Sequence, residues 1–277
     1  MGDFVTAVNG VSTEKRTSFQ IIDQLSENPN AKSLTMTFRR QGPLDLANEG
    51  EIREIELPRE FEEIKNPIEY SLSRRDDGTN VAYVRIKEFN ALVKSRLGSA
   101  LEDLENQGAN AYVIDLRGNP GGAFQSAVSI AGFFLDDKIA TNVIDNNLTE
   151  MPFQTTKGKV IVDKDDPIVI WLDKRSASAS EVFAGALNDN CRALTMGDRS
   201  FGKGLIQAVY GLKNGGGLVL TVAKYTTPDG TDIQGNGIQP DIASSLPTLP
   251  FFSSDTSKVD FETIASREKA CIANDNL

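Results

Sequence analysis

Hydrophobic and polar residues alternate along several short stretches of the chain, and this period of two predicts β-strands. Apolar residues spaced three and four apart predict helices over 92–106, over Phe124–Leu135 and from about Ser180 to Asn188. The expected strands are 3–8, Ser33–Phe38, Glu51–Leu57, Val81–Ile86, Ala111–Leu116, Pro167–Leu172, Gly204–Tyr210 and Gly217–Tyr225. A strand, a loop and a helix follow one another twice in the middle of the chain, which predicts a layered α/β domain.

The pattern also divides the chain. Residues 1–42 form a compact stretch in which Thr17 or Ser18 is expected to cap a short helix, Phe19–Leu25. A polar linker through Gly50 follows, so we expect a core domain over 43–250. Residues 251–277 have no strong period and are expected to form a mobile C-terminal tail.

Composition narrows the class of protein. The 277 residues carry a formal charge of -10, which argues against nucleic acid as a partner and gives no strong membrane-binding signal. No apolar run approaches the roughly 20 residues of a spanning helix, and the N-terminus does not resemble a signal or transit peptide. The two cysteines, Cys191 and Cys271, are too few to indicate a redox compartment; they can pair, or Cys191 can be a buried thiol.

The chain contains no histidine. This excludes Ser-His-Asp and Cys-His mechanisms and every histidine-containing zinc site, and two cysteines cannot build a four-cysteine zinc site. No metal or other cofactor is expected. A hydrolase of this composition must use Lys, Asp, Glu or an amine as its base.

Two loops that follow predicted strands carry candidate chemistry. In Asp115-Leu-Arg-Gly-Asn-Pro-Gly-Gly122, the paired glycines Gly121 and Gly122 leave backbone N–H groups free at a helix start, which suits a phosphate or a developing oxyanion. From this loop alone, a tight glycine turn is the better interpretation. The second loop, Arg175-Ser-Ala-Ser-Ala-Ser-Glu181, places Ser178 at a helix N-terminus. Ser178 and Glu181 also match a capping box, and taken alone the motif favours that cap.

A third element, Phe201-Gly-Lys-Gly-Leu-Ile-Gln207, places Lys203 between two glycines at the start of an apolar strand. Burial would lower the pKa of that lysine, so that a neutral amine could take a serine proton. On a strand, Gln207 shares a face with Lys203 and can hydrogen-bond it. The rival Ser-x-x-Lys pattern occurs three times, beginning at Ser12, Ser200 and Ser266, and is discarded because it lacks its companion motifs.

Together these blocks resemble the carboxyl-terminal processing (tail-specific) proteases, a Ser–Lys peptidase family with a crotonase-like layered α/β core of the ClpP/crotonase type. The similar blocks are Tyr83–Phe89, Asp115–Gly122, Ser176–Leu187, Phe201–Gln207, Tyr225–Gly230 and Gly237–Asp241. The resemblance implies that Ser178 is the nucleophile, Lys203 the general base and Gln207 the residue that orients it. It further implies oxyanion N–H groups from Ala179 and from Gly121 or Gly122.

The resemblance also implies a function: endoproteolysis near the C-terminus of a protein substrate with an unstructured tail, through an acyl-enzyme. Blocks such as Gly235-Asn-Gly-Ile-Gln-Pro-Asp241 are most similar to the photosynthetic branch, which trims the photosystem II D1 precursor. That branch implies the thylakoid lumen of a chloroplast or cyanobacterium, with the bacterial periplasm as the alternative. The oligomeric state is not predicted.

Residues 2–41 resemble only the second half of a PDZ domain, so we expect a partial PDZ domain that lacks its carboxylate-binding loop. This departure keeps a second class of function open, a non-catalytic peptide-binding or scaffold protein that retains the peptidase fold. A crotonase-like acyl-CoA enzyme is a third alternative, weakened by the lack of a basic motif for nucleotide phosphates.

Overall fold

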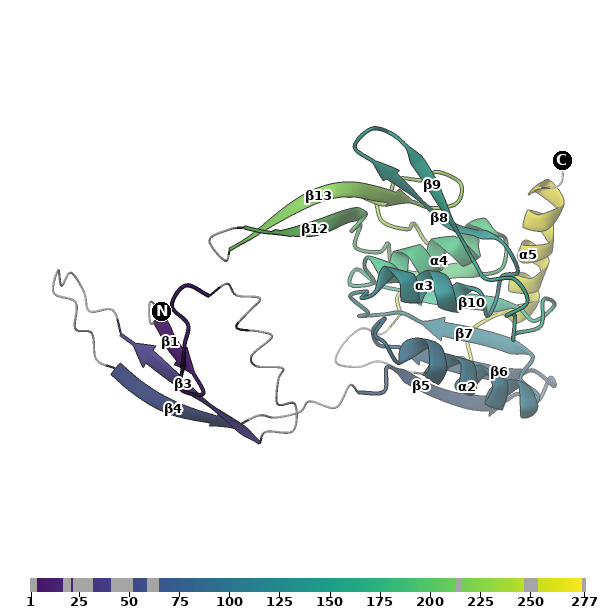
Figure 1. Ribbon diagram of the computed structural model, residues 1–277. Coiled ribbons are helices and arrows are strands. Elements are labelled where there is room, and N and C mark those ends of the chain that lie inside the picture. The colour runs from purple at the N-terminus through teal and green to yellow at the C-terminus, as the bar shows by residue number, and fades with distance from the viewer. Residues whose placement is uncertain are drawn as a thin grey trace. The chain divides into compact units, whose positions relative to one another are not determined.

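The computed structural model describes residues 4–16, 21, 32–40, 52–58, 65–212, 216–246 and 254–275 (Figure 1). By its internal contacts the chain divides into two units, residues 1–63 with 208–220, and residues 64–207 with 221–277. Among the helices described, none is both long and apolar enough to span a membrane.

The first unit contains an antiparallel sheet with the strand order β2-β1-β3-β4. Its strands are β1 (Phe4–Val8), β2 (Val11–Ser12), β3 (Ser33–Arg39) and β4 (Ile52–Pro58). The three long strands confirm the alternation in the sequence. Strand β4 pairs with β3 along its whole length, so this unit extends beyond the boundary expected at residue 42. The predicted helix Phe19–Leu25 lies outside the described residues, except for Ile21, which is helical.

The second unit is built on a six-stranded sheet with the order β14-β11-β10-β7-β6-β5. The strands are β5 (Ile68–Arg74), β6 (Asn80–Ile86), β7 (Ala111–Asp115), β10 (Ile168–Leu172), β11 (Leu194–Gly197) and β14 (Ile242–Ala243). All neighbours are parallel except β5, which pairs antiparallel with β6. Strands β5, β11 and β14 were not predicted from the sequence.

Side-chain alternation along the central strands divides the core between the two faces of this sheet. On β7, Tyr112 and Ile114 join one apolar cluster, whereas Ala111 and Val113 join another. The first cluster lies under α2 (Val93–Asn106), α3 (Phe124–Ala131) and α4 (Ala179–Asp189). Each face of the sheet therefore carries buried apolar side chains, as expected for a largely parallel sheet. The three predicted helices are confirmed, although α3 ends at Ala131.

In a second sheet, strand β8 (Ile139–Asp145) packs on α3 and α4 (Figure 1). This sheet has the order β12-β13-β8-β9, and its other strands are β9 (Glu150–Gln154), β12 (Leu205–Gly211) and β13 (Gly217–Thr226). The sequence analysis missed β8 and β9. The layered α/β architecture that it predicted is present.

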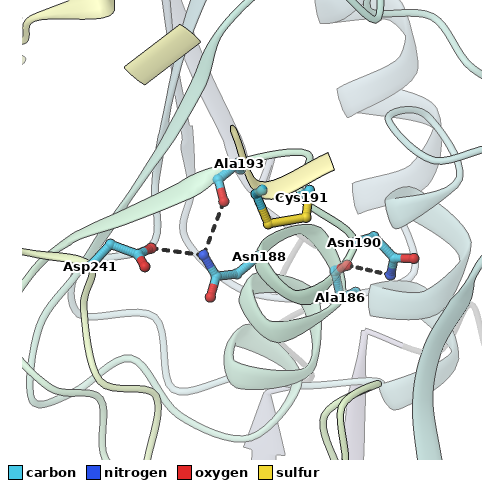
Figure 2. The surroundings of a disulfide bond; sticks show 7 residues. Ala186, Asn188, Asn190, Cys191, Ala193 and Asp241 are labelled. Atoms are coloured by element: carbon cyan, nitrogen blue, oxygen red, sulfur yellow. Dashed lines mark hydrogen bonds between the residues drawn. A yellow bond between two sulfur atoms is a disulfide. The ribbon is translucent and has the colours of Figure 1, made fainter. Parts of the chain in front are cut away.

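The expectation of a mobile tail is wrong for the described residues of that segment. Helix α5 (Phe261–Asp275) covers the second face of the six-stranded sheet, and Val259, Phe261 and Ile264 are buried there. A disulfide joins Cys271 on α5 to Cys191, just beyond the end of α4 (Figure 2). Cys191, for which a buried free thiol was the alternative, is therefore paired. The disulfide connects α5 to the end of α4, the helix that begins next to Ser178.

Candidate active site

The candidate nucleophile lies at the turn between β10 and α4. All five residues of β10 are buried, and α4 begins at Ala179. Ser178 takes φ 57° and ψ -118°, a conformation that non-glycine residues rarely adopt. A strained serine at a sharp strand-to-helix turn presents its hydroxyl at the end of a sheet, which is a known arrangement for nucleophilic serines.

The two neighbouring serines of the loop serve the framework. Ser176 and Ser180 are fully buried. The Ser176 hydroxyl donates to the Leu116 carbonyl at 2.9 Å, and the Ser180 hydroxyl donates to the Asn119 carbonyl at 3.1 Å. Ser178 is the partly exposed member of the three. Of the serines in this loop, its hydroxyl is therefore the one that a substrate can reach.

Glu181 holds the Ser178 loop and the Lys203 loop together. Its carboxylate is fully buried and accepts four hydrogen bonds. Oε2 accepts from the backbone N–H of Ser178 at 2.7 Å and of Lys203 at 2.9 Å. Oε1 accepts from the hydroxyl of Ser200 and the N–H of Gly202, both at 2.6 Å. The carboxylate half of the predicted capping box is thus present, and the same group fixes the candidate base next to the candidate nucleophile.

The structure corrects the expectation that Lys203 is buried. Strand β12 begins only at Leu205, and the side chains of Lys203 and Gln207 are exposed. Within residues 65–212, no hydrogen bond joins the Lys203 ammonium to Ser178 or to Gln207. The structure therefore places the backbone of Lys203 near Ser178, whereas the Lys203 side chain is exposed to solvent.

The glycines on either side of Lys203 are needed for close packing of the backbone and not because the lysine is buried. A Cβ on Gly204 would lie 2.6 Å from the backbone nitrogen of Gln234, and one on Gly202 would lie 3.1 Å from the Gly235 carbonyl carbon. Glycine is needed because two backbones approach closely. These glycines report tight loop packing rather than a buried lysine.

Tyr225 is a site residue that the sequence analysis did not single out. It lies on β13 with its ring buried, and its hydroxyl is 3.1 Å from Ser178 Oγ. The same hydroxyl donates to the Lys203 carbonyl. Burial raises the pKa of Tyr225. Only its place in a block that resembles the peptidase family could have drawn attention to it.

The glycine loop separates the roles of Gly121 and Gly122. The Gly121 N–H donates to Asn119 Oδ1 at 2.9 Å and is therefore occupied. Gly121 also lies against the nucleophile loop, since a Cβ there would be 2.8 Å from Ser178 Cβ and 2.7 Å from the Ala177 carbonyl oxygen. Phe89 forms hydrogen bonds with both neighbours of Gly122: its N–H donates to the Gly121 carbonyl, and its carbonyl accepts from the Ala123 N–H. In that bridge the Gly122 N–H faces away from Phe89.

One backbone donor in each of the two loops remains available. Over residues 65–246 as far as they are described, no hydrogen bond is recorded from the N–H of Gly122 or from that of Ala179. Ala179 is the first residue of α4, where backbone N–H groups have no partner inside the helix. The arrangement can hold a negatively charged oxygen beside Ser178.

A buried ionic network supports the glycine loop. Asp115 accepts two hydrogen bonds from the Arg117 side chain, at 2.9 and 2.7 Å, and one from the Tyr83 hydroxyl at 2.6 Å. Arg117 lies 4.6 Å from the centroid of the Trp171 ring. Asn119 then joins the two loops, because its carbonyl accepts from the Ala177 N–H at 3.0 Å. The network makes Asp115 and Arg117 framework residues.

The structure also gives no support to the Ser-x-x-Lys pattern that begins at Ser200. The Ser200 hydroxyl is buried, donates to Glu181 and accepts from the Ile238 N–H at 2.6 Å. In the described ranges, no group of three or more Cys, Asp or Glu side chains is arranged to hold a metal ion.

Comparisons with known proteins identify the family of the chain. A model of Peptidase family S41 matches residues 80–244, which are 165 of the 277 residues. The chain belongs to peptidase family S41. The family resemblance inferred from the motifs is therefore confirmed.

The chain is 38% identical over 245 residues to a chloroplastic carboxyl-terminal-processing peptidase 1 of Arabidopsis thaliana, covering 87% of this chain and 47% of the relative. It is 34% identical over 254 residues to a carboxyl-terminal-processing protease of Synechocystis sp., covering 90% and 56%. The chain thus spans about half the length of these relatives. Among solved structures it is similar to a photosystem II D1 C-terminal processing protease, with a TM-score of 0.63 and 29% identity over 96% of this chain and 67% of the other.

Proposed function

We propose that this chain is the catalytic part of a serine endopeptidase that cleaves near the C-terminus of protein substrates. The observation that carries the proposal is the position of Ser178, whose reachable hydroxyl lies in a strained turn directly before the available backbone N–H of Ala179. Membership of family S41 supports the reaction class.

In the proposed mechanism, Lys203 is the general base. Its backbone is tied to Ser178 through Glu181 and Tyr225, so only the four-carbon side chain has to turn inward. A neutral amine accepts the Ser178 proton, and Ser178 Oγ attacks the scissile carbonyl carbon. Gln207, the third residue of β12, is the group proposed to hold the amine once it has turned.

The carbonyl oxygen of the substrate becomes negatively charged in this step. Ala179 and Gly122 are proposed as its hydrogen-bond donors, in preference to Gly121, because the Gly121 N–H is bonded to Asn119. The lysine then returns the proton to the leaving amine, and water releases the acyl-enzyme. Two donors of this kind typically contribute about 3 kcal/mol each to lowering the barrier.

The finer assignments rest on the relatives. The named chloroplastic and cyanobacterial proteins support a photosynthetic processing peptidase, with the D1 precursor as its proposed substrate and the thylakoid lumen as its proposed location. The disulfide Cys191–Cys271 fits such a compartment, because disulfides persist mainly outside reducing cytosol. We also propose that the four-stranded sheet of the first unit is the partial PDZ domain.

One observation favours a second function. The exposed Lys203 side chain is the arrangement expected of a peptide-binding protein that retains the peptidase fold without its activity.

Cleavage of a peptide with an unstructured C-terminal extension separates these functions. The chain, Ser178→Ala, Lys203→Ala and the control Lys174→Ala would be assayed side by side at several pH values between about 6 and 10. Lys174 is an exposed lysine in the same β10–α4 connection. We expect cleavage by the chain and by Lys174→Ala only. Turnover by Ser178→Ala or Lys203→Ala at the rate of the unchanged chain would refute the proposal.

A fluorophosphonate probe provides the second readout. The proposed mechanism requires labelling of Ser178, located by mass spectrometry, and its loss in Ser178→Ala. A chain that neither cleaves the peptide nor reacts with the probe would support the non-catalytic function.

A further inference from the structure

The phenolic oxygen of Tyr225 lies between the candidate nucleophile and the candidate base. It is 3.1 Å from Ser178 Oγ and is also hydrogen-bonded to the main-chain carbonyl of Lys203. The ring is held in place by packing: it is buried and stacks on Phe124 with ring centroids 6.1 Å apart. Phe124 is the first residue of α3, directly after the glycine loop.

The direction of the two hydrogen bonds follows from the number of protons. A phenol has one hydrogen, and a carbonyl oxygen can only accept. The Tyr225 proton therefore goes to the Lys203 carbonyl, and Ser178 donates its own hydroxyl proton to the Tyr225 oxygen. Burial raises the pKa of Tyr225 above its ordinary value, so the phenol is neutral near neutral pH and has its proton to donate.

We propose that Tyr225 is a positioning residue for the Ser178–Lys203 pair. One fixed oxygen holds Ser178 Oγ and the main chain of Lys203 in place relative to each other, and the serine proton turns from the Tyr225 oxygen to the amine once the lysine side chain has turned inward. This inference rests on the proposed function and adds to it a residue outside the Ser-Ala-Ser-Ala-Ser-Glu and Phe-Gly-Lys-Gly blocks.

The expected size of the effect follows from geometry. Misplacing reacting groups by about 1 Å can cost on the order of 100-fold in rate. Tyr225→Phe keeps the stacked ring and removes both hydrogen bonds. We expect kcat to fall roughly 10- to 100-fold, within the range for such misplacement, while KM changes less than about threefold because no substrate contact is removed.

The matched control is Tyr112→Phe. Tyr112 is also a buried tyrosine whose hydroxyl bonds a side chain, Glu105 at 2.6 Å, but it lies on β7 away from the Ser178 loop. Both variants lose a tyrosine hydroxyl, and only Tyr225→Phe should lose rate. Thermal unfolding and active-site titration with the fluorophosphonate probe correct each kcat for the folded fraction.

A second measurement keeps the inference testable if Tyr225→Phe folds poorly. Fluorinated tyrosine at position 225 retains shape but has a more acidic phenol, and a phenolate cannot donate to the Lys203 carbonyl. We expect its kcat to decline at alkaline pH where that of the unchanged chain does not. A purely structural role would not move the pH profile.

The outcomes separate this inference from the proposed function. If the unchanged chain cleaves peptide, Ser178→Ala does not, and Tyr225→Phe keeps at least half of the normal kcat with an unaltered pH profile in the fluorinated protein, the inference is wrong and the proposed function stands. If the unchanged chain itself neither cleaves nor reacts with the probe, the proposed function fails, and the role of Tyr225 fails with it.

Discussion

The carboxylate of Glu181 is the group on which the geometry of the candidate site depends most directly. Glu181→Gln preserves shape but replaces one acceptor oxygen by an NH₂ group, which can only donate. Four donors converge on Glu181: the N–H groups of Ser178, Gly202 and Lys203, and the Ser200 hydroxyl. Two of the four must therefore face a donor in the variant.

The cost depends on which way the amide turns. If its oxygen faces Ser178 and Lys203, the Ser200 hydroxyl can rotate but the Gly202 N–H cannot, so one buried donor is left without a partner. If the amide turns the other way, the N–H groups of Ser178 and Lys203 both lose theirs. A buried unsatisfied donor costs about 1–3 kcal/mol. We expect the first orientation and a loss of about 1–3 kcal/mol in the free energy of unfolding, against a total of roughly 5–15 kcal/mol for a domain.

The fluorescence of Trp171 can be used to measure the free energy of unfolding. It is the only tryptophan of the chain, lies buried on β10 and reports unfolding by its fluorescence in urea. The matched control is Glu105→Gln: Glu105 accepts one hydroxyl hydrogen bond, that of Tyr112 at 2.6 Å, which an amide oxygen can also accept. The reasoning is refuted if Glu181→Gln unfolds within about 0.5 kcal/mol of the unchanged chain, the spread typical of surface substitutions.

Three further predictions concern the glycine loop, the disulfide and pH. Gly121→Ala should abolish cleavage, because its Cβ would meet Ser178 Cβ at 2.8 Å, whereas Gly78→Ala, which meets open space at φ 88° against 99° for Gly121, should retain it; equal peptide turnover by the two would contradict this. Reduction of the Cys191–Cys271 disulfide, which closes a loop of 80 residues, should lower the free energy of unfolding by about 4 kcal/mol in urea titrations with and without reductant. An unchanged midpoint would refute that role. Burial raises the pKa of Glu268 to about 7, so the folded protein keeps a proton on Glu268 at pH values where the unfolded chain has lost it. The protonated side chain therefore contributes to the free energy of unfolding. This contribution is fully present below about pH 4 and is lost as the pH rises through 7. Glu268→Gln should flatten that slope, and an unaltered slope would exclude Glu268 as its source.

Strands and helices that bury a regular face were predictable from their own residues. β6, β7 and β10 are apolar runs in a largely parallel sheet, and α2 and α4 repeat their apolar residues at helical spacing. Helix α5 was missed because its apolar residues are few and its packing depends on partners far away in the chain. The Cys191–Cys271 bond and the contact with the second face of the sheet have no local signal.

The candidate site shows the same division. The motifs around Ser178 and Lys203 placed two loops on the sequence, but the burial expected for Lys203 came from reading its flanking glycines as signs of a buried strand. In the structure those glycines allow the approach of Gln234 and Gly235. Close approach between distant backbones cannot be read from either segment alone.

By itself, the amino-acid sequence determined which chemistry is available: without histidine, a serine and a lysine in two glycine- and serine-rich loops are the candidates, set in a layered α/β fold. Residue types and local periodicity suffice for this, because both are properties of short segments. Only the tertiary structure decided how Glu181 and Tyr225 connect those loops. Hydrogen bonds between residues 22 and 47 positions apart depend on how the sheets and helices pack, and that packing is a property of the whole domain.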